Sequence, residues 1–246
     1  MTYENIIVEK KNGMAKITLN RPRVLNAMNE ALLQELVAAL EDAEADESVR
    51  VVVVTGAGRA FSAGRDLKSI STGGERPGAD RYAMLERLSK PTIAAVNGFC
   101  YTGAFELAMC ADIIIASENA VFADTHARYG MVPGGGATQR LPRAIGSKRA
   151  KELFFTSDTV TAREAERLGI VNKVVPPEKL DEAVEEMVAK IVKNSPDSIR
   201  IMKSLVNNGM RMDLEAGLRL EQEHHKGRLA RTEDSQDRFQ SFMERK

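Results

Sequence analysis

The residues best suited to chemistry lie where a predicted strand gives way to a predicted helix. In the segment 94–112, a run of small apolar residues ends at Gly98, and Gly103 opens an apolar helical pattern. At the N-terminus of a helix the backbone N–H groups lack intrahelical partners, and the helix dipole favours negative charge. Glu106 follows three residues later on the same helix face as Gly103. The spacing therefore indicates an anion-binding turn with a carboxyl group beside it.

Two glycine-containing loops upstream are further candidates. The first, TGAG at 55–58, follows the apolar strand 51–54, as a dinucleotide-binding turn would. Such a turn has a third glycine and opens directly into a helix, whereas here Phe61 stands at the third position. We therefore interpret this segment as a turn that ends a strand. The second, FSAGRDLK at 61–68, bends from small residues into polar ones and by itself predicts only a loop.

The elements that position these residues follow from hydrophobic periodicity and turn signals. A hairpin is predicted at 6–19 with its turn at 11–13, and Asn29 can cap a helix over 30–45. The alternation that follows is typical of an α/β layered architecture. We predict further strands at 49–55, 92–97, 112–116 and 170–175, and helices at 104–110, 148–155 and 162–168. After Pro177 the pattern is almost wholly helical, with segments near 179–193, 196–208, 212–230 and 233–245. The turn-rich stretch 69–78 predicts a mobile surface loop.

Composition excludes several classes of protein. The 246 residues, 43% of them hydrophobic, are enough for one compact unit with a sizeable core. Thirty-five basic and thirty-five acidic residues cancel, so we expect no nucleic-acid partner. No apolar run approaches the roughly 20 residues that a bilayer requires, and the start resembles no signal peptide, so we expect no membrane contact and a cytoplasmic location. Only Cys100 and Cys110 are present, which indicates neither a metal site nor a disulfide framework.

Taken together, six segments resemble the enoyl-CoA hydratase/isomerase family, also called the crotonase family. Each is weak alone, but they occur in the family's order and cover essentially the whole chain. They are ITLNRP at 17–22 with LNA at 25–27, FSAGRDL at 61–67, AVNG at 95–98 with ELAM at 106–109, PGGGATQRL at 133–141, AERLGIVN at 165–172 and TED at 232–234.

The resemblance implies a fold, an assembly and a substrate class. The expected fold is a crotonase-type spiral of ββα turns over 1–192, followed by a C-terminal helical trimerisation region over 193–246. We expect a homotrimer or a homohexamer built as a dimer of trimers. The substrate would be an acyl-coenzyme A thioester, so coenzyme A enters as part of the substrate and no separate cofactor is expected.

The resemblance also assigns roles to particular residues. The backbone N–H groups of Arg65 and Gly103 would form an oxyanion hole for the thioester oxygen, where preorganised donors stabilise an enolate. The Arg65 side chain departs from the small residue usual in the family, and it could reach a coenzyme A phosphate, pair with an acidic neighbour, or lie in solvent. Contacts to the acyl or coenzyme A parts are expected from Ser62, Ala63, Arg65, Asp66, Leu67, Lys68, Gly134 and Gly135.

Family hydratases use two glutamates, and only one of them is present here. Glu106 matches the glutamate that activates water, and the second position, twenty residues on in the family, falls on His126. Because a histidine titrates near neutral pH, His126 could replace a carboxylic acid, or it could be a neutral polar wall of the pocket. Asp124 could orient the imidazole, although neighbouring strand side chains tend to point apart.

These assignments predict a hydro-lyase. We expect reversible addition of water to a 2-enoyl-CoA, which gives a 3-hydroxyacyl-CoA, with Glu106 and His126 as catalytic residues. A double-bond isomerase needs one proton-transferring acid and stays open as an alternative. So do other acyl-CoA chemistry of the family and an acyl-CoA-binding paralogue with little turnover. The acyl chain length, the metabolic pathway and the choice between trimer and hexamer are not predicted.

Overall fold

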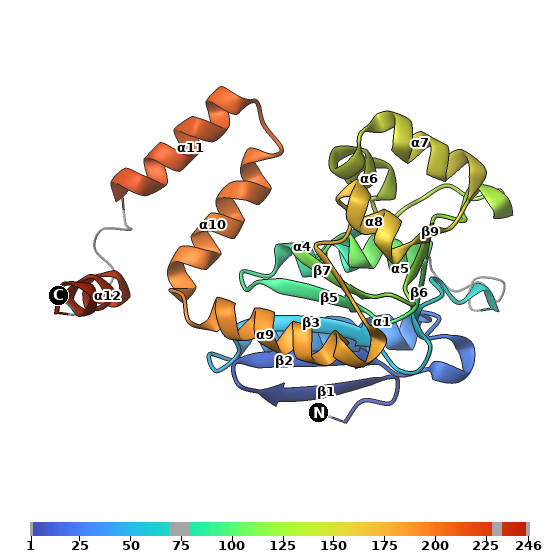
Figure 1. The fold of residues 1–246 in the computed structure, drawn as a ribbon, viewed down its shortest axis with the longest axis horizontal. Helices are drawn as coiled ribbons and strands as arrows, with labels where there is room; N and C mark the ends of the chain where they lie inside the picture. The colour runs from blue at the N-terminus through green and yellow to red at the C-terminus, as the bar shows by residue number, and fades with distance from the viewer. Residues whose placement is uncertain (1, 69–78, 228–232, 245–246) are drawn as a thin grey trace.

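The computed structural model describes residues 2–68, 79–227 and 233–244, so the loop predicted at 69–78 lies outside the described residues (Figure 1). The strands form a six-stranded sheet in the order β1-β2-β3-β5-β7-β10 and a four-stranded sheet in the order β4-β6-β8-β9. Their bounds are β1 (Ile6–Lys11), β2 (Met14–Leu19), β3 (Val51–Gly56), β4 (Ala60–Ser62), β5 (Thr92–Val96), β6 (Phe99–Tyr101), β7 (Ile113–Ser117), β8 (Val121–Ala123), β9 (Val160–Thr161) and β10 (Lys173–Val175).

The chain winds between the two sheets as a spiral. In the consecutive pairs β3–β4, β5–β6 and β7–β8, the first strand joins the larger sheet and the second joins the smaller one. Strand β4 pairs in parallel with β6, and β6 with β8. Because the carboxyl ends of parallel neighbours meet at one edge, the segments that follow β4, β6 and β8 lie side by side. These segments begin at residues 63, 102 and 124.

Helices cover both faces of the larger sheet and extend the chain beyond it (Figure 1). They are α1 (Glu30–Ala45), α3 (Ala79–Tyr82), α4 (Met84–Arg87), α5 (Gly103–Ala108), α6 (Ala137–Ile145), α7 (Ser147–Thr156), α8 (Ala162–Leu168), α9 (Leu180–Val192), α10 (Pro196–Gly209), α11 (Leu214–Gly227) and α12 (Glu233–Glu244). Short 3₁₀ turns are η1 (Pro22–Val24), η2 (Ala127–Tyr129) and η3 (Pro177–Lys179).

The core has two layers because strand side chains alternate between the faces of the sheet. In β3, Val52 and Val54 pack into the cluster that includes the apolar face of α1. Val51 and Val53 pack into the opposite cluster with residues of α9. All four valines are fully buried, as the continuous apolar run predicts for a central parallel strand.

The local signals at the N-terminal end are confirmed. The hairpin β1–β2 turns at Asn12 and Gly13, both with positive φ (51° and 78°), as a two-residue type I′ turn requires. Asn29 caps α1, because its side chain accepts a hydrogen bond from the N–H of Leu32 at 2.9 Å.

Several short elements depart from the expected ranges. Strands β4, β6, β8 and β9 span two or three residues each, too few for a periodic pattern. The strand expected at 170–175 is confined to β10, because the N–H groups of Ile170 and Val171 donate to the carbonyl of Ala165 within α8. The expected boundary between 192 and 193 falls between α9 and α10, and the division into two domains stays a prediction.

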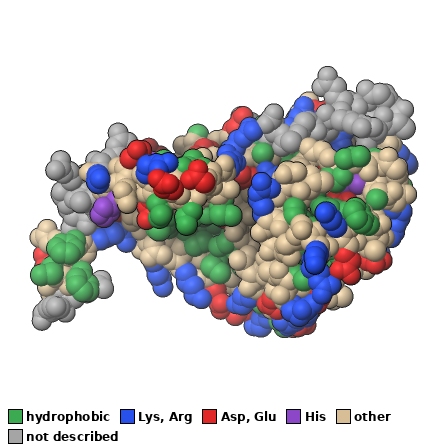
Figure 2. All heavy atoms as spheres, turned by 90° about the horizontal axis from the view of Figure 1, so that it is seen from above, with side chains coloured by type: hydrophobic (Ala, Val, Ile, Leu, Met, Phe, Trp, Pro, Cys, Tyr) green, Lys and Arg blue, Asp and Glu red, His purple; other side chains and the backbone are tan. Residues whose placement is uncertain are grey.

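The helices α10–α12 extend away from the sheets (Figure 1) and contact the core through a few polar bonds. Lys203 forms an ion pair with Asp112 at 2.7 Å, and Arg211 reaches Glu86 at 2.5 Å. Asp112 also accepts hydrogen bonds from the N–H and the hydroxyl of Thr92, so its carboxylate links α10 to the larger sheet. Figure 2 shows hydrophobic side chains gathered on the surface of these helices. The large exposed ones are Met202, Val206, Leu214, Leu218, Phe239, Phe242 and Met243.

Candidate active site

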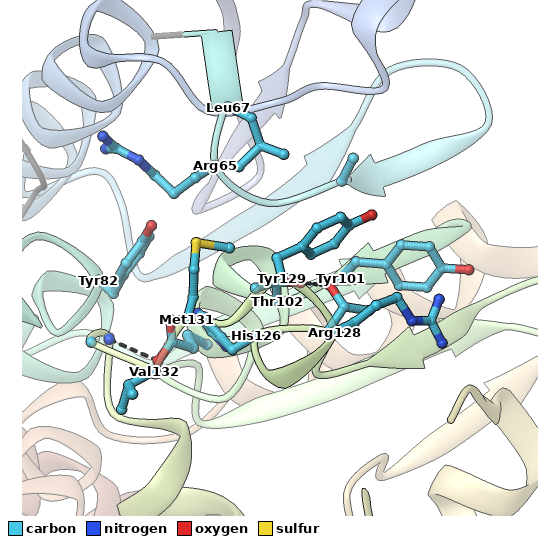
Figure 3. Close-up of a pocket in the computed structure, with 15 residues that line it drawn as sticks. Arg65, Leu67, Tyr82, Tyr101, Thr102, His126, Arg128, Tyr129, Met131 and Val132 are labelled. Carbon is cyan, nitrogen blue, oxygen red and sulfur yellow. Dashed lines mark hydrogen bonds and ion pairs between the residues drawn. The ribbon is translucent and has the colours of Figure 1, made fainter. Parts of the chain in front are cut away.

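A cavity of about 450 Å³ opens where the segments after β4, β6 and β8 meet (Figure 3). Three stretches far apart in the sequence therefore contribute to one site, together with α3 and the loop before α6. The lining residues are Ala63, Arg65, Leu67, Tyr82, Tyr101, Thr102, Glu106, Thr125, His126, Arg128, Tyr129, Met131, Val132, Gly134 and Gly135.

Glu106 is held in the cavity by backbone donors. Its Oε1 accepts hydrogen bonds from the N–H of Gly135 at 2.7 Å and of Ala137 at 3.1 Å. A Cβ on Gly135 would lie 2.7 Å from Oε2, so only glycine allows this loop to approach the carboxylate. Burial raises the pKa of Glu106, and the two N–H bonds offset part of that effect. Glu106 is therefore held in a fixed position, and its carboxyl group keeps a proton to a higher pH than an exposed glutamate does.

His126 faces Glu106 across the cavity. Its Nε2 lies 3.9 Å from Oε2 of Glu106, and its Nδ1 lies 2.8 Å from Oδ1 of Asp124. Asp124 is 2% exposed, and its Oδ1 also accepts a hydrogen bond from the N–H of His126 at 3.1 Å. With Nδ1 directed at the Asp124 carboxyl group, Nε2 is the ring nitrogen turned toward Glu106.

The expectation that Asp124 and His126 point apart is wrong. Strand β8 ends at Ala123, and residues 124–126 lead into η2. Asp124 and His126 are two residues apart, a spacing that puts side chains on the same side even in a strand, so the alternation of adjacent strand residues does not separate this pair.

The two expected oxyanion-hole residues lie on neighbouring loops. The N–H of Met28 donates to the carbonyl of Gly64, and the N–H of Asp66 donates to the carbonyl of Met28. In this parallel bridge Met28 bonds to Gly64 and Asp66, the neighbours of Arg65 on either side. The N–H of Arg65 itself is therefore directed away from Met28. Gly103 is the first residue of α5.

Gly64 allows these two loops to touch. Its φ is +93°, and a Cβ there would lie 2.7 Å from the carbonyl oxygen of Tyr101 and 3.3 Å from the nitrogen of Gly103. A larger residue would therefore separate the loops.

Tyr82 lines the pocket, although no sequence motif singled it out. It is 3% exposed, and its hydroxyl oxygen lies 2.9 Å from the point where a Cβ on Gly103 would stand. Its ring also packs against Gly135. Burial raises the pKa of the phenol far above its ordinary value, so Tyr82 is a neutral hydrogen-bond donor. It belongs to no motif, and only the packing of α3 brings it to the site.

The residues expected to contact coenzyme A divide into two groups. Ala63, Leu67, Gly134 and Gly135 line the cavity together with Arg65. Ser62 is fully buried and instead supports the loop, because its hydroxyl donates to the carbonyl of Asn26 and accepts from the N–H of Gly64. Asp66 forms an ion pair with Arg21 at 3.0 Å, and Lys68 is exposed.

The Arg65 side chain crosses the top of the cavity and turns away from His126 (Figure 3). Burial lowers the pKa of its guanidinium, and the carboxylates of Glu30 and Asp66 counter this effect. The role of this side chain toward the substrate stays a prediction.

The remaining cysteine and histidine side chains lie outside the site. Cys100 and Cys110 are buried, and burial raises the pKa of the Cys110 thiol to about 12, so both are inert apolar residues. His224 and His225 are exposed on α11. Among the described residues, no three His, Cys, Asp or Glu side chains cluster in a way that could hold a metal ion. No helix in the described ranges has the length and apolar character to span a bilayer.

Comparison with solved structures places the fold among enoyl-CoA hydratases. A crystal structure of enoyl-CoA hydratase from Bacillus anthracis is 38% identical, with a TM-score of 0.93 over 99% of this chain and 97% of that chain. The expected fold class, a crotonase-type α/β core with a helical C-terminal region, is confirmed.

Sequence relatives agree over the full length. The short-chain-enoyl-CoA hydratase of Clostridium acetobutylicum is 41% identical over 100% of this chain and 97% of its own. The crotonyl-CoA hydratase of Syntrophomonas wolfei is 37% identical over 100% and 97%. The enoyl-CoA hydratase/isomerase family model matches residues 9–246. The chain belongs to the enoyl-CoA hydratase/isomerase family.

Proposed function

We propose that this chain is an enoyl-CoA hydratase, which adds water reversibly to a 2-enoyl-CoA to give a 3-hydroxyacyl-CoA. The observation that carries the proposal is the pair Glu106 and His126, whose Oε2 and Nε2 atoms face each other at 3.9 Å. Two atoms at this separation can both hydrogen-bond to one water molecule, whose oxygen would lie roughly 2.8 Å from each. Hydration needs two groups that handle protons, whereas shifting a double bond needs one.

In the proposed reaction, Glu106 takes a proton from the water as its oxygen bonds to Cβ. The electron pair of the double bond moves to the thioester oxygen, which gives an enolate. His126 holds the proton for Cα on Nε2, because Nδ1 donates to Asp124 and the carboxylate offsets the imidazolium charge. Transfer of that proton to Cα collapses the enolate, and Glu106 then returns its proton to His126. The sum is one water added to the substrate.

The enolate oxygen is assigned to the backbone N–H groups of Arg65 and Gly103. The close contact of their loops at Gly64 supports this assignment. Removing one donor of this kind typically costs about 2.7–4 kcal/mol of transition-state stabilisation. A structure with a bound 3-hydroxyacyl-CoA tests the assignment, and it fails if the two nitrogens point into different cavities.

The remaining contacts follow from the lining of the cavity. Ala63, Leu67, Gly134 and Gly135 contact the acyl and pantetheine parts of the substrate, and Lys68 meets the nucleotide part on the surface. Coenzyme A stays bound to the acyl group as a thioester in both substrate and product, so the reaction requires no further cofactor.

Crotonyl-CoA and a 3-enoyl-CoA, assayed side by side, test the function. Because relatives are named for short-chain and crotonyl substrates, crotonyl-CoA is the first substrate to measure. We expect loss of the conjugated enoyl absorbance with crotonyl-CoA and little turnover of the 3-enoyl-CoA. Isomerisation without hydration would identify a double-bond isomerase, and binding without turnover would identify an acyl-CoA-binding paralogue.

We further propose that the protein is a homotrimer or a homohexamer. The exposed apolar side chains of α10, α11 and α12 form more apolar surface than a soluble monomer usually leaves uncovered. Sedimentation at micromolar concentration tests this, and a monodisperse monomer would contradict it. The cytoplasm stays the predicted location, and cell fractionation would test it.

A further inference from the structure

Thr102 has an unusual backbone conformation at the edge of the cavity. Its φ is 54° and its ψ is −113°, which lies outside the left-handed helical region. Among the described non-glycine residues with positive φ, Thr102 alone is β-branched. A branched Cβ makes this conformation especially unfavourable, so the surrounding structure must hold it in place.

Three hydrogen bonds surround this residue. The N–H of Thr102 donates to the carbonyl of Ala123 at 2.8 Å, and its carbonyl accepts from the N–H of Glu106 at 3.0 Å. The side-chain Oγ1 lies 2.5 Å from Oγ1 of Thr125. The hydroxyl pair is the one bond of the three that a side-chain substitution can remove without touching the main chain.

The conformation of Thr102 controls the direction of a neighbouring donor. The N–H of Gly103 belongs to the peptide group that joins Thr102 to Gly103, so the ψ angle of Thr102 sets where this N–H points. If ψ relaxed toward an ordinary value, the peptide plane would turn, and the N–H would leave its place in the proposed oxyanion hole.

We propose that Thr125 is a positioning residue, whose hydroxyl holds Thr102 in the conformation that aims the Gly103 N–H into the cavity. This inference rests on the proposed function, because it takes the Gly103 amide as a donor to the thioester oxygen. Thr125 stands between Asp124 and His126, so the tripeptide 124–126 orients the imidazole and the oxyanion-hole amide together.

The test combines substitutions at both ends of the hydroxyl pair. Thr125→Val keeps the shape but removes the hydrogen bond, and Thr125→Ser keeps the bond. Glycine adopts positive φ without a Cβ penalty, so in a Thr102→Gly background the restraint is no longer needed. Adding Thr125→Val to that background therefore measures whether Thr125 acts through the conformation of residue 102.

Two readouts are used on each variant. One is kcat and KM for crotonyl-CoA. The other is the ultraviolet absorbance of acetoacetyl-CoA, whose enolate form increases when a bound thioester oxygen is stabilised. The second readout reports the oxyanion hole without any hydration step. Thermal unfolding shows whether each variant is folded.

We expect Thr125→Val to weaken the enolate absorbance and to lower kcat by up to about 10²-fold, the loss that a misplacement of about 1 Å can cause. KM should change by less than about threefold, because the lost interaction belongs to the transition state. Thr125→Ser should restore most of the activity. In the Thr102→Gly background, Thr125→Val should cost no more than about twofold, because the two sites are coupled.

Thr55→Val is the matched control. Thr55 is a buried threonine whose hydroxyl donates to the carbonyl of Ala95 at 2.8 Å, and it has no part in the site. This variant should lower thermal stability and leave kcat and the enolate absorbance unchanged.

Specific results would overturn the inference. It fails if Thr125→Val keeps wild-type kcat and enolate absorbance. It also fails if Thr125→Val lowers kcat as much in the Thr102→Gly background as in the wild type, because Thr125 would then act through His126 or the fold. A wild-type enzyme that does not hydrate crotonyl-CoA refutes the proposed function but leaves the enolate test in force. A wild-type enzyme that also gives no enolate absorbance overturns the inference itself.

Discussion

Substitution of Glu106 by glutamine separates catalysis from stability, because its carboxylate has two distinct duties. Oε1 accepts two backbone hydrogen bonds from the loop before α6, and Oε2 faces His126. A glutamine keeps a carbonyl oxygen for both N–H groups and loses only the ability to exchange a proton. The fold should therefore survive while the reaction does not.

The expected magnitudes differ enough to be distinguished. Loss of acid–base catalysis should reduce kcat by about 10²-fold to 10⁴-fold. By contrast, Glu106→Ala would leave two buried N–H groups without an acceptor, at about 1–3 kcal/mol each, or about 2–6 kcal/mol in total. Glu106→Gln should change the free energy of unfolding by about 1 kcal/mol or less, since a charged acceptor is exchanged for a neutral one.

The assay is hydration of crotonyl-CoA, with dissociation constants measured for a non-reacting acyl-CoA. Glu35→Gln is the matched control, because Glu35 also accepts N–H bonds, from Glu4 and Asn5, on α1 outside the cavity. It should keep wild-type kcat. The reasoning is refuted if Glu106→Gln retains more than about a tenth of wild-type kcat, or if thioester binding is lost in a folded protein.

Three further predictions follow from the site and the surface. His126→Ala should lower kcat by about 10²-fold or more and remove one ionisation from the pH–rate profile, whereas an effect that does not depend on pH would indicate a polar wall instead. Asp124→Asn should lower kcat less and leave substrate binding intact. Because burial raises the pKa of Glu106 above 4.5, the stability that it contributes is complete below pH 4.5 and is lost as pH rises through the raised pKa. In urea denaturation, the free energy of unfolding of the wild type should therefore fall relative to that of Glu106→Gln as the pH rises through the raised pKa. A difference between the two proteins that does not change with pH would contradict a raised pKa of Glu106. Phe239→Lys with Phe242→Lys should shift sedimentation toward smaller species if α12 lies in an interface, and an unchanged assembly would exclude that face.

Much of the fold could be predicted from the sequence, because its longer elements have strong local signals. The valine run at 51–54, the Asn29 cap and the Asn12–Gly13 turn each depend on neighbours in the chain, and the structure agrees with all three. The long C-terminal helices were predicted within a few residues for the same reason. The two- and three-residue strands of the smaller sheet were not, because pairing with neighbours, and not periodicity, makes them strands.

The candidate site divides in the same way. The sequence by itself determined that Glu106 follows Gly103 at a helix start, and the family resemblance added Arg65 and His126. Only the tertiary structure decided that Asp124 orients His126, that Tyr82 enters the pocket and that Thr125 meets Thr102. Apart from Asp124 and His126, which lie in one short segment, these contacts join residues from separate strands, loops and helices. Their distances are set by the parallel pairing of β4, β6 and β8, which no local pattern encodes.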